Sequence, residues 1–145
     1  MNISEIKSQL PESVGNTEHC SRVLDYVDQF RKTVEKAKQP GFTIEDWSGF
    51  ASLVDTENFE RVGHHCEVMR WDEYIGFVTQ FATELKWEGT FRRVQERGNV
   101  VYLELTEYAS VGDHTQIANT MTVYRFNASG KIDHLTVYIQ QAPEQ

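Results

Sequence analysis

The C-terminal half of the chain alternates apolar and polar positions in runs that are separated by turn residues. The runs cover residues 87–95, 100–108, 116–126 and 132–140. Valine, threonine, tyrosine and isoleucine dominate them, and glycine, asparagine and aspartate stand between them. This pattern is typical of strands joined by tight turns. The sequence therefore predicts a four-stranded antiparallel meander.

The N-terminal half has the spacing of helices. One apolar face repeats every three or four residues and consists of Val23, Val27, Phe30, Val34 and Ala37. It predicts a helix that Asn16 or Thr17 can cap and that ends before Pro40. Two further helices are predicted at 44–54 and 71–85, with a short strand at 58–62 and a loop at 62–67 between them.

The predicted order is helix, helix, short strand, helix and then four strands. Helices that are segregated from antiparallel strands give an α+β fold. Three N-terminal helices on the concave face of a curved, mainly antiparallel sheet form a cone with an internal cavity. Such a cavity is where a site for a small molecule is expected.

Composition narrows the possible partners. The 145 residues suit a single domain, with residues 1–15 as a loose arm, and the hydrophobic share of 39% indicates a globular chain. The net charge of -8 disfavours nucleic acid and anionic membrane surfaces as partners. No signal peptide or membrane-spanning run is visible. Cys20 and Cys66 lack metal-type spacing and are predicted to be reduced thiols in a cytoplasmic protein.

The order of elements resembles that of the SnoaL-like, or NTF2-like, superfamily. The most specific stretch is 123–132, with Gly-Lys-Ile at its end, followed by Leu135 and Tyr138. The resemblance covers residues from about 17 to 140 and implies a cystatin-like cone whose outer sheet face often pairs with a second subunit. It also implies a choice among isomerases, cyclases, dehydratases, hydrolases and non-catalytic binders, because the fold hosts all of them.

Two family patterns find no match. Limonene-epoxide hydrolases carry an arginine and an aspartate in the first long central strand and another aspartate in the last. The corresponding positions here hold Tyr108, Ser110 and Val137, so this activity is not predicted. SnoaL cyclases use an acidic residue in the cavity, and the last strand offers no clear counterpart.

The resemblance to ketosteroid isomerases goes further. That family uses a carboxylate base after the second helix and an oxyanion hole made of a tyrosine and a protonated aspartate. The corresponding positions fall on Glu60, Tyr26 and Thr122. Thr122 can donate a hydrogen bond but lacks the acidity of aspartate. The resemblance therefore implies related proton-transfer chemistry.

Glu60 and His65 are the predicted acid/base pair, with Tyr26 as the third catalytic candidate. A buried carboxylate can act as a base, and an imidazole carries a proton near neutral pH. Plainer interpretations stay open: Glu60 as a surface carboxylate paired with an arginine, His65 as a solvated loop residue and Tyr26 as a core residue.

Five residues are predicted to contact the ligand: Thr122, Glu104, Thr106, His64 and Asp55. Glu104 and Thr106 follow from a register in which they share a face with Thr120 and Thr122. A slip of one residue would turn every side chain to the other face. An outward Glu104 and an Asp55 confined to a turn are the alternatives.

No metal or cofactor is predicted. His64 and His65 are adjacent and seldom converge on one ion, and no phosphate-binding glycine loop or nucleophile elbow is present.

Two functions remain: a cofactor-free acid/base enzyme (isomerase, cyclase or dehydratase) acting on a small apolar or polycyclic molecule, and a non-catalytic binding or association domain. A homodimer through the convex sheet face is expected, because the last strand is apolar on one face and carries Tyr138 on the other.

Overall fold

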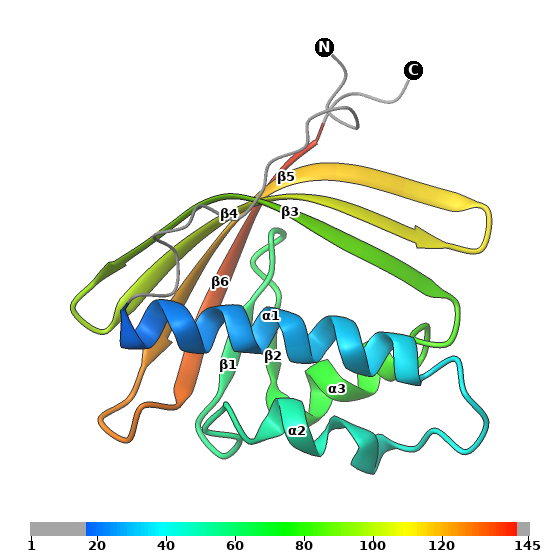
Figure 1. Ribbon diagram of the computed structural model, residues 1–145, viewed down its shortest axis with the longest axis horizontal. Helices are drawn as coiled ribbons and strands as arrows, with labels where there is room; N and C mark the ends of the chain where they lie inside the picture. Colours follow the sequence, from blue (N-terminus) through cyan, green and yellow to red (C-terminus); the bar gives the residue numbers. More distant parts are fainter. Residues whose placement is uncertain (1–16, 142–145) are drawn as a thin grey trace.

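The computed structural model of the protein describes residues 17–141, so the predicted loose arm at 1–15 lies outside the described residues. A curved sheet of six strands arches over one long helix, and the shorter helices lie on the same concave side (Figure 1). The elements are α1 (Glu18–Lys36), η2 (Ile44–Trp47), α2 (Ser48–Ala51), β1 (Glu60–Val62), β2 (Val68–Arg70), α3 (Trp71–Thr79), β3 (Leu85–Arg97), β4 (Val100–Val111), β5 (His114–Phe126) and β6 (Ile132–Gln141).

The strand order is β2-β1-β6-β5-β4-β3, and β1 with β6 is the parallel pair. The α+β cone and the four-stranded meander are confirmed. Three local predictions are wrong. Residues 44–54 form a 3-10 turn and one short α-helical turn, the third helix ends at Thr79, and the strand β2 was not predicted. The helix at Trp71 ends early because Leu85 already begins β3 and is buried there.

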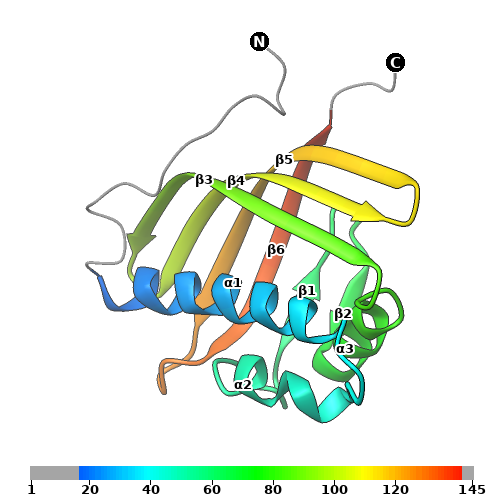
Figure 2. The same cartoon turned by 45° about the vertical axis from the view of Figure 1, so that its right-hand side comes forward.

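An aromatic cluster joins the helices to one another under the sheet. Phe50 lies at its centre, 4.4 Å from Tyr26, 5.7 Å from Trp47 and 5.3 Å from Trp71 between ring centroids. Figure 2 shows α1 passing beneath β3 to β6, with α2 and α3 at the side of β1 and β2. The cluster fixes α1 relative to α2 and α3, and it therefore sets the width of the space between the helices and the sheet.

The turn between β5 and β6 is held by contacts from distant parts of the chain. Phe126 and Ile132 are buried there, as predicted, and Phe126 stacks on His19 with ring centroids 4.4 Å apart. Arg22 Nη1 donates to the Gly130 carbonyl at 2.7 Å, and Gly130 has a φ of +77°. A side chain at position 130 would collide with the Arg22 guanidinium, since its Cβ would lie 1.7 Å from Nη1.

Cys20 is a buried free thiol and Cys66 an exposed one. No helix within residues 17–141 combines the length and apolar character that crossing a membrane requires. The cytoplasmic location stays a prediction.

The convex face of the sheet carries exposed aromatic side chains. Tyr102 and Tyr108 from β4 and Tyr138 from β6 lie on this face, and Tyr138 is 59% exposed. We expect a homodimer that buries this face, because exposed aromatic side chains favour association. Analytical ultracentrifugation should find a dimer at micromolar concentration and a shift toward monomer in Tyr138→Glu. A monomeric wild-type protein would contradict the expectation.

Candidate functional site

A cavity of about 470 Å³ lies between the helices and the concave face of the sheet. This size is within the usual range for small-molecule sites. Most of its wall is apolar, from α1, α3 and the strands β3 to β6. The charged or polar side chains that line it, besides the indole of Trp87, are Tyr26, Arg61, Tyr74, Glu107, Gln116, Thr120, Thr122 and Tyr124.

Glu107 is the carboxylate of this cavity among the described residues. It faces inward because β4 places it opposite Ala118 of β5 and Gly89 of β3. The Trp87 indole Nε1 donates to Glu107 Oε1 at 2.8 Å. Gly89 makes room for this contact, since a Cβ at that position would lie 2.9 Å from the Trp87 ring. The indole holds one carboxylate oxygen, and Oε2 has no hydrogen-bond partner within residues 17–141.

Three tyrosines form the polar centre of the cavity. Burial raises the pKa of Tyr26, Tyr74 and Tyr124, so all three hydroxyls are protonated donors at neutral pH. The nearby charge of Glu107 raises the pKa of Tyr124 and Tyr74 further, whereas Arg61 lowers both. Glu107 on β4 and Arg61 on β1 therefore shift the pKa of the same two tyrosines in opposite directions.

The Tyr26 hydroxyl is buried without a well-formed hydrogen bond. Its residue is 5% exposed, and no acceptor or donor within residues 17–141 meets hydrogen-bond geometry. The Tyr74 hydroxyl is near enough to influence the pKa of Tyr26, but the geometry leaves Tyr26 unsatisfied. A buried polar atom without a partner costs stability, so this hydroxyl is a candidate ligand contact.

Arg61 enters the cavity from β1, where it lies beside Leu135 of β6. Its guanidinium carbon is 5.0 Å from the centroid of the Tyr74 ring, which is cation–π geometry. Within residues 17–141, no carboxylate oxygen lies within ion-pair distance of Arg61.

Comparison with known proteins identifies the architecture. No family model matches the chain, and no curated protein matches it in sequence. Solved structures do match. An LEH-like epoxide hydrolase from M. tuberculosis has a TM-score of 0.67 at 13% identity, over 85% of this chain and 83% of that chain. A proposed ketosteroid isomerase from Kribbella flavida has 0.64 at 15% identity, over 88% and 82%. The chain has an NTF2-like fold.

A proposed SnoaL-like polyketide cyclase from Jannaschia also matches, with a TM-score of 0.63 at 12% identity over 92% of both chains. Other NTF2-like structures that match are of unknown function. These identities show the fold alone, and the neighbours differ in their stated activities. The chemistry of this NTF2-like cone therefore has to be argued from its own residues.

The predicted register between β4 and β5 is wrong by one residue. Leu105 lies opposite Thr120 and Glu107 opposite Ala118, so these residues face the cavity. Glu104 and Thr106 lie on the convex face. Glu104 pairs with Arg93 Nε at 3.1 Å, and the Thr106 hydroxyl donates to Asn119 at 2.9 Å. Neither can contact a ligand in the cone. Of the predicted site residues, Tyr26 and Thr122 line the cavity.

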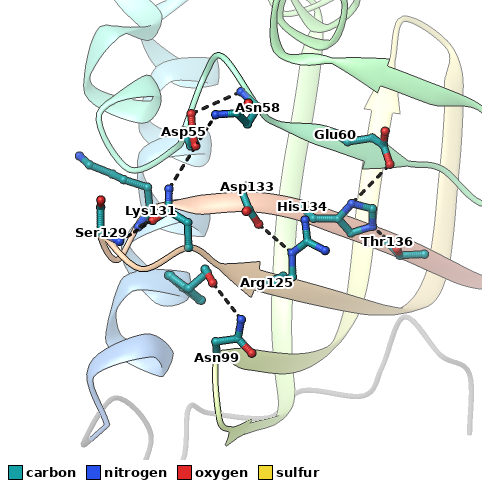
Figure 3. Close-up of polar contacts among 12 residues, drawn as sticks. Asp55, Asn58, Glu60, Asn99, Arg125, Ser129, Lys131, Asp133, His134 and Thr136 are labelled. Atoms are coloured by element: carbon teal, nitrogen blue, oxygen red, sulfur yellow. Dashed lines mark hydrogen bonds and ion pairs between the residues drawn. The ribbon is translucent and has the colours of Figure 1, made fainter.

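Glu60 and Asp55 do not line the cavity. Figure 3 shows the polar contacts that they make instead. Glu60 Oε1 is 3.5 Å from His134 Nδ1, on the face of β1 opposite to Arg61. Asp55 accepts hydrogen bonds from Asn58 Nδ2 at 3.0 Å and from Asn127 Nδ2 at 3.1 Å. The bond from Asn58 is the main reason that the pKa of Asp55 is lowered. Asp55 thus ties the β5–β6 turn to the segment before β1.

His64 and His65 lie on the exposed loop between β1 and β2, with their ring centroids 3.8 Å apart and their planes tilted by 42°. The backbone N–H of His65 donates to Glu67 Oε2 at 2.9 Å. Neither histidine lines the cavity. The structure therefore does not bring Glu60 and His65 together as an acid/base pair. Sequence reasoning missed Glu107 and Arg61, although Arg61 directly follows Glu60.

Proposed function

We propose that this protein is a cofactor-free acid/base enzyme that moves a proton on a small, mainly apolar carbonyl compound. The observation that carries the proposal is a hydrogen-bonded carboxylate and an unsatisfied buried hydroxyl in one apolar cavity. Glu107 supplies the carboxylate and Tyr26 the hydroxyl. Isomerases that shift a double bond next to a ketone need a base and an oxyanion donor of this kind.

The proposed reaction uses each group in one step. Glu107 Oε2 takes a proton from the carbon next to the carbonyl, while Trp87 holds Oε1. The electron pair of the C–H bond forms a carbon–carbon double bond, and the carbonyl oxygen becomes an oxyanion. The Tyr26 hydroxyl donates a hydrogen bond to that oxygen. Glu107 then returns the proton to another carbon, so no co-reactant is consumed.

The neighbours support an enzyme of this class, because they include a proposed ketosteroid isomerase and a proposed polyketide cyclase. Hydrolysis by two opposed carboxylates is less compatible with the cavity. The inward positions of β6 are Leu135, Val137 and Ile139, and all are apolar. Non-catalytic binding is the second candidate. It is favoured by the absence of a second carboxylate beside Glu107 among the described lining residues.

Deuterium exchange distinguishes the two functions. Tetralone and a β,γ-unsaturated ketosteroid are incubated with the protein in D₂O, and exchange at the carbon beside the carbonyl is followed by NMR. An enzyme should exchange at least one of these ketones faster than buffer and bovine serum albumin controls. Binding of both ketones without accelerated exchange would favour the non-catalytic domain.

Replacing Tyr26 by phenylalanine should have opposite effects on stability and exchange. The change removes an unsatisfied buried hydroxyl, so the free energy of unfolding should rise by about 1 kcal/mol. It also removes the oxyanion donor, so exchange should slow by roughly 10²-fold. Urea denaturation and the exchange assay measure the two effects. The control is Tyr102→Phe on the convex face, which should change neither quantity. A destabilised Tyr26→Phe protein with full exchange activity would contradict the assignment.

A further inference from the structure

Arg61 is the sole lysine or arginine among the described residues that line the cavity. It stands on β1, and β6 and β5 separate it from β4, which carries Glu107. The two charges form no ion pair with each other. The cavity thus has a positive wall and a negative wall, and the proposed proton transfer uses only the negative one.

Four other described arginines pair with carboxylates, whereas Arg70, Arg92 and Arg97 do not and lie outside the cavity lining. Arg31 pairs with Asp28, Arg93 with Glu104 and Arg125 with Asp133. Arg61 lies in the lining, over the Tyr74 ring, and no carboxylate oxygen of the described residues is within ion-pair distance of it, although its charge helps to lower the pKa of Glu67. Placing a charge in a mainly apolar cavity is costly unless something compensates it. The chain has a net charge of -8, so acidic partners were available to it.

Arg61 and the tyrosine hydroxyl beside it can both donate hydrogen bonds to a ligand. A guanidinium has N–H groups and no acceptor, and the protonated hydroxyl of Tyr74 lies beside it in the lining. An ionised carboxyl group is the ligand group that a planar guanidinium binds best, because both of its oxygens accept hydrogen bonds.

We propose that Arg61 and Tyr74 form a subsite that binds the carboxylate of an apolar acid. The inference rests on the proposed function in one respect: it makes the substrate an apolar keto acid, whose reacting carbon lies toward Glu107. The acid group sets the orientation of the ligand. A neutral ketone would leave Arg61 without an ion-pair partner and would bind in either direction.

The test compares two ligands of the same shape, naphthoate and naphthamide, by isothermal titration calorimetry at neutral pH and near-physiological salt. Wild-type protein should bind naphthoate roughly tenfold more tightly than naphthamide, a difference of about 1.4 kcal/mol. Arg61→Met should lose this preference and keep its affinity for naphthamide, which also shows that it is folded. Arg61→Lys should restore part of the preference. Arg93→Gln, on the convex face, should keep the full preference.

Glu107→Gln separates this inference from the proposed function. Removing a negative charge from the cavity should strengthen naphthoate binding while leaving naphthamide unaffected. A preference for the acid that depends on Arg61 supports the subsite even if the protein exchanges no ketone. Equal affinities for the two ligands in wild-type protein, no binding of either at millimolar concentration, or a preference that survives in Arg61→Met would overturn it.

Discussion

Replacing Glu107 by glutamine should slow deuterium exchange on the order of 10²–10⁴-fold, the usual contribution of a positioned general base. The amide oxygen can still accept the hydrogen bond from Trp87, and the residue keeps its size and its place in β4. The change therefore removes the proton acceptor and little else. The rate of exchange into a ketone that wild-type protein accepts is the measurement, with circular dichroism as the check on folding.

Glu104→Gln is the matched control for this variant. Glu104 is on the same strand, but its carboxylate pairs with Arg93 on the convex face. We expect exchange in Glu104→Gln to remain within a factor of two of wild type, a rough bound for an exposed ion pair that contributes little. If Glu107→Gln kept full activity, or if Glu104→Gln lost as much, the base would have to be sought elsewhere.

Truncating Phe126 to alanine should lower the free energy of unfolding by about 3–5 kcal/mol, as for other large aromatic residues in cores. Phe126 is 2% exposed, is the last residue of β5 and stacks on His19 of α1. Its loss leaves a cavity where the sheet meets the start of α1. Chemical denaturation measures the effect through the midpoint at an unchanged slope.

Ile44→Ala provides the comparison, because Ile44 is 53% exposed at the start of η2. Its effect should stay within about 0.5 kcal/mol, as for most surface substitutions. A Phe126→Ala midpoint close to that of wild type would mean that the β5–β6 turn contributes little to the core.

The sequence predicted the cone because its strongest signals are local. The four long strands are separated by glycine, asparagine and aspartate, and α1 has a continuous apolar face. The strand β2 was missed because three residues are too few to show a period. The early end of α3 was missed because Leu85 continues the helical spacing while tertiary contacts place it in β3.

The site was harder to predict because it depends on which alternate residues of each strand face the cavity. Polar residues Glu104 and Thr106 were placed inward by analogy with a polar cavity, yet Leu103 and Leu105 face the helices. Taking this apolar alternation as the covered face would have placed Glu107 inside. The same argument applies to β1, where Arg61 faces inward and Glu60 outward. The position of Tyr26 in the cavity lining could be predicted because the family resemblance placed it on the first helix.

The difference in size between β1 and the meander has a consequence for the unliganded protein. Arg61 belongs to a hairpin with three residues in each strand, whereas Glu107 belongs to strands of ten to thirteen residues. Small peripheral units open locally at lower free energy than a large sheet does. A ligand that touches both residues would link β1 to β4 across the cavity and suppress that opening. Amide hydrogen exchange in β1 and β2 would then report occupancy of the cone, while the meander itself stays nearly unchanged.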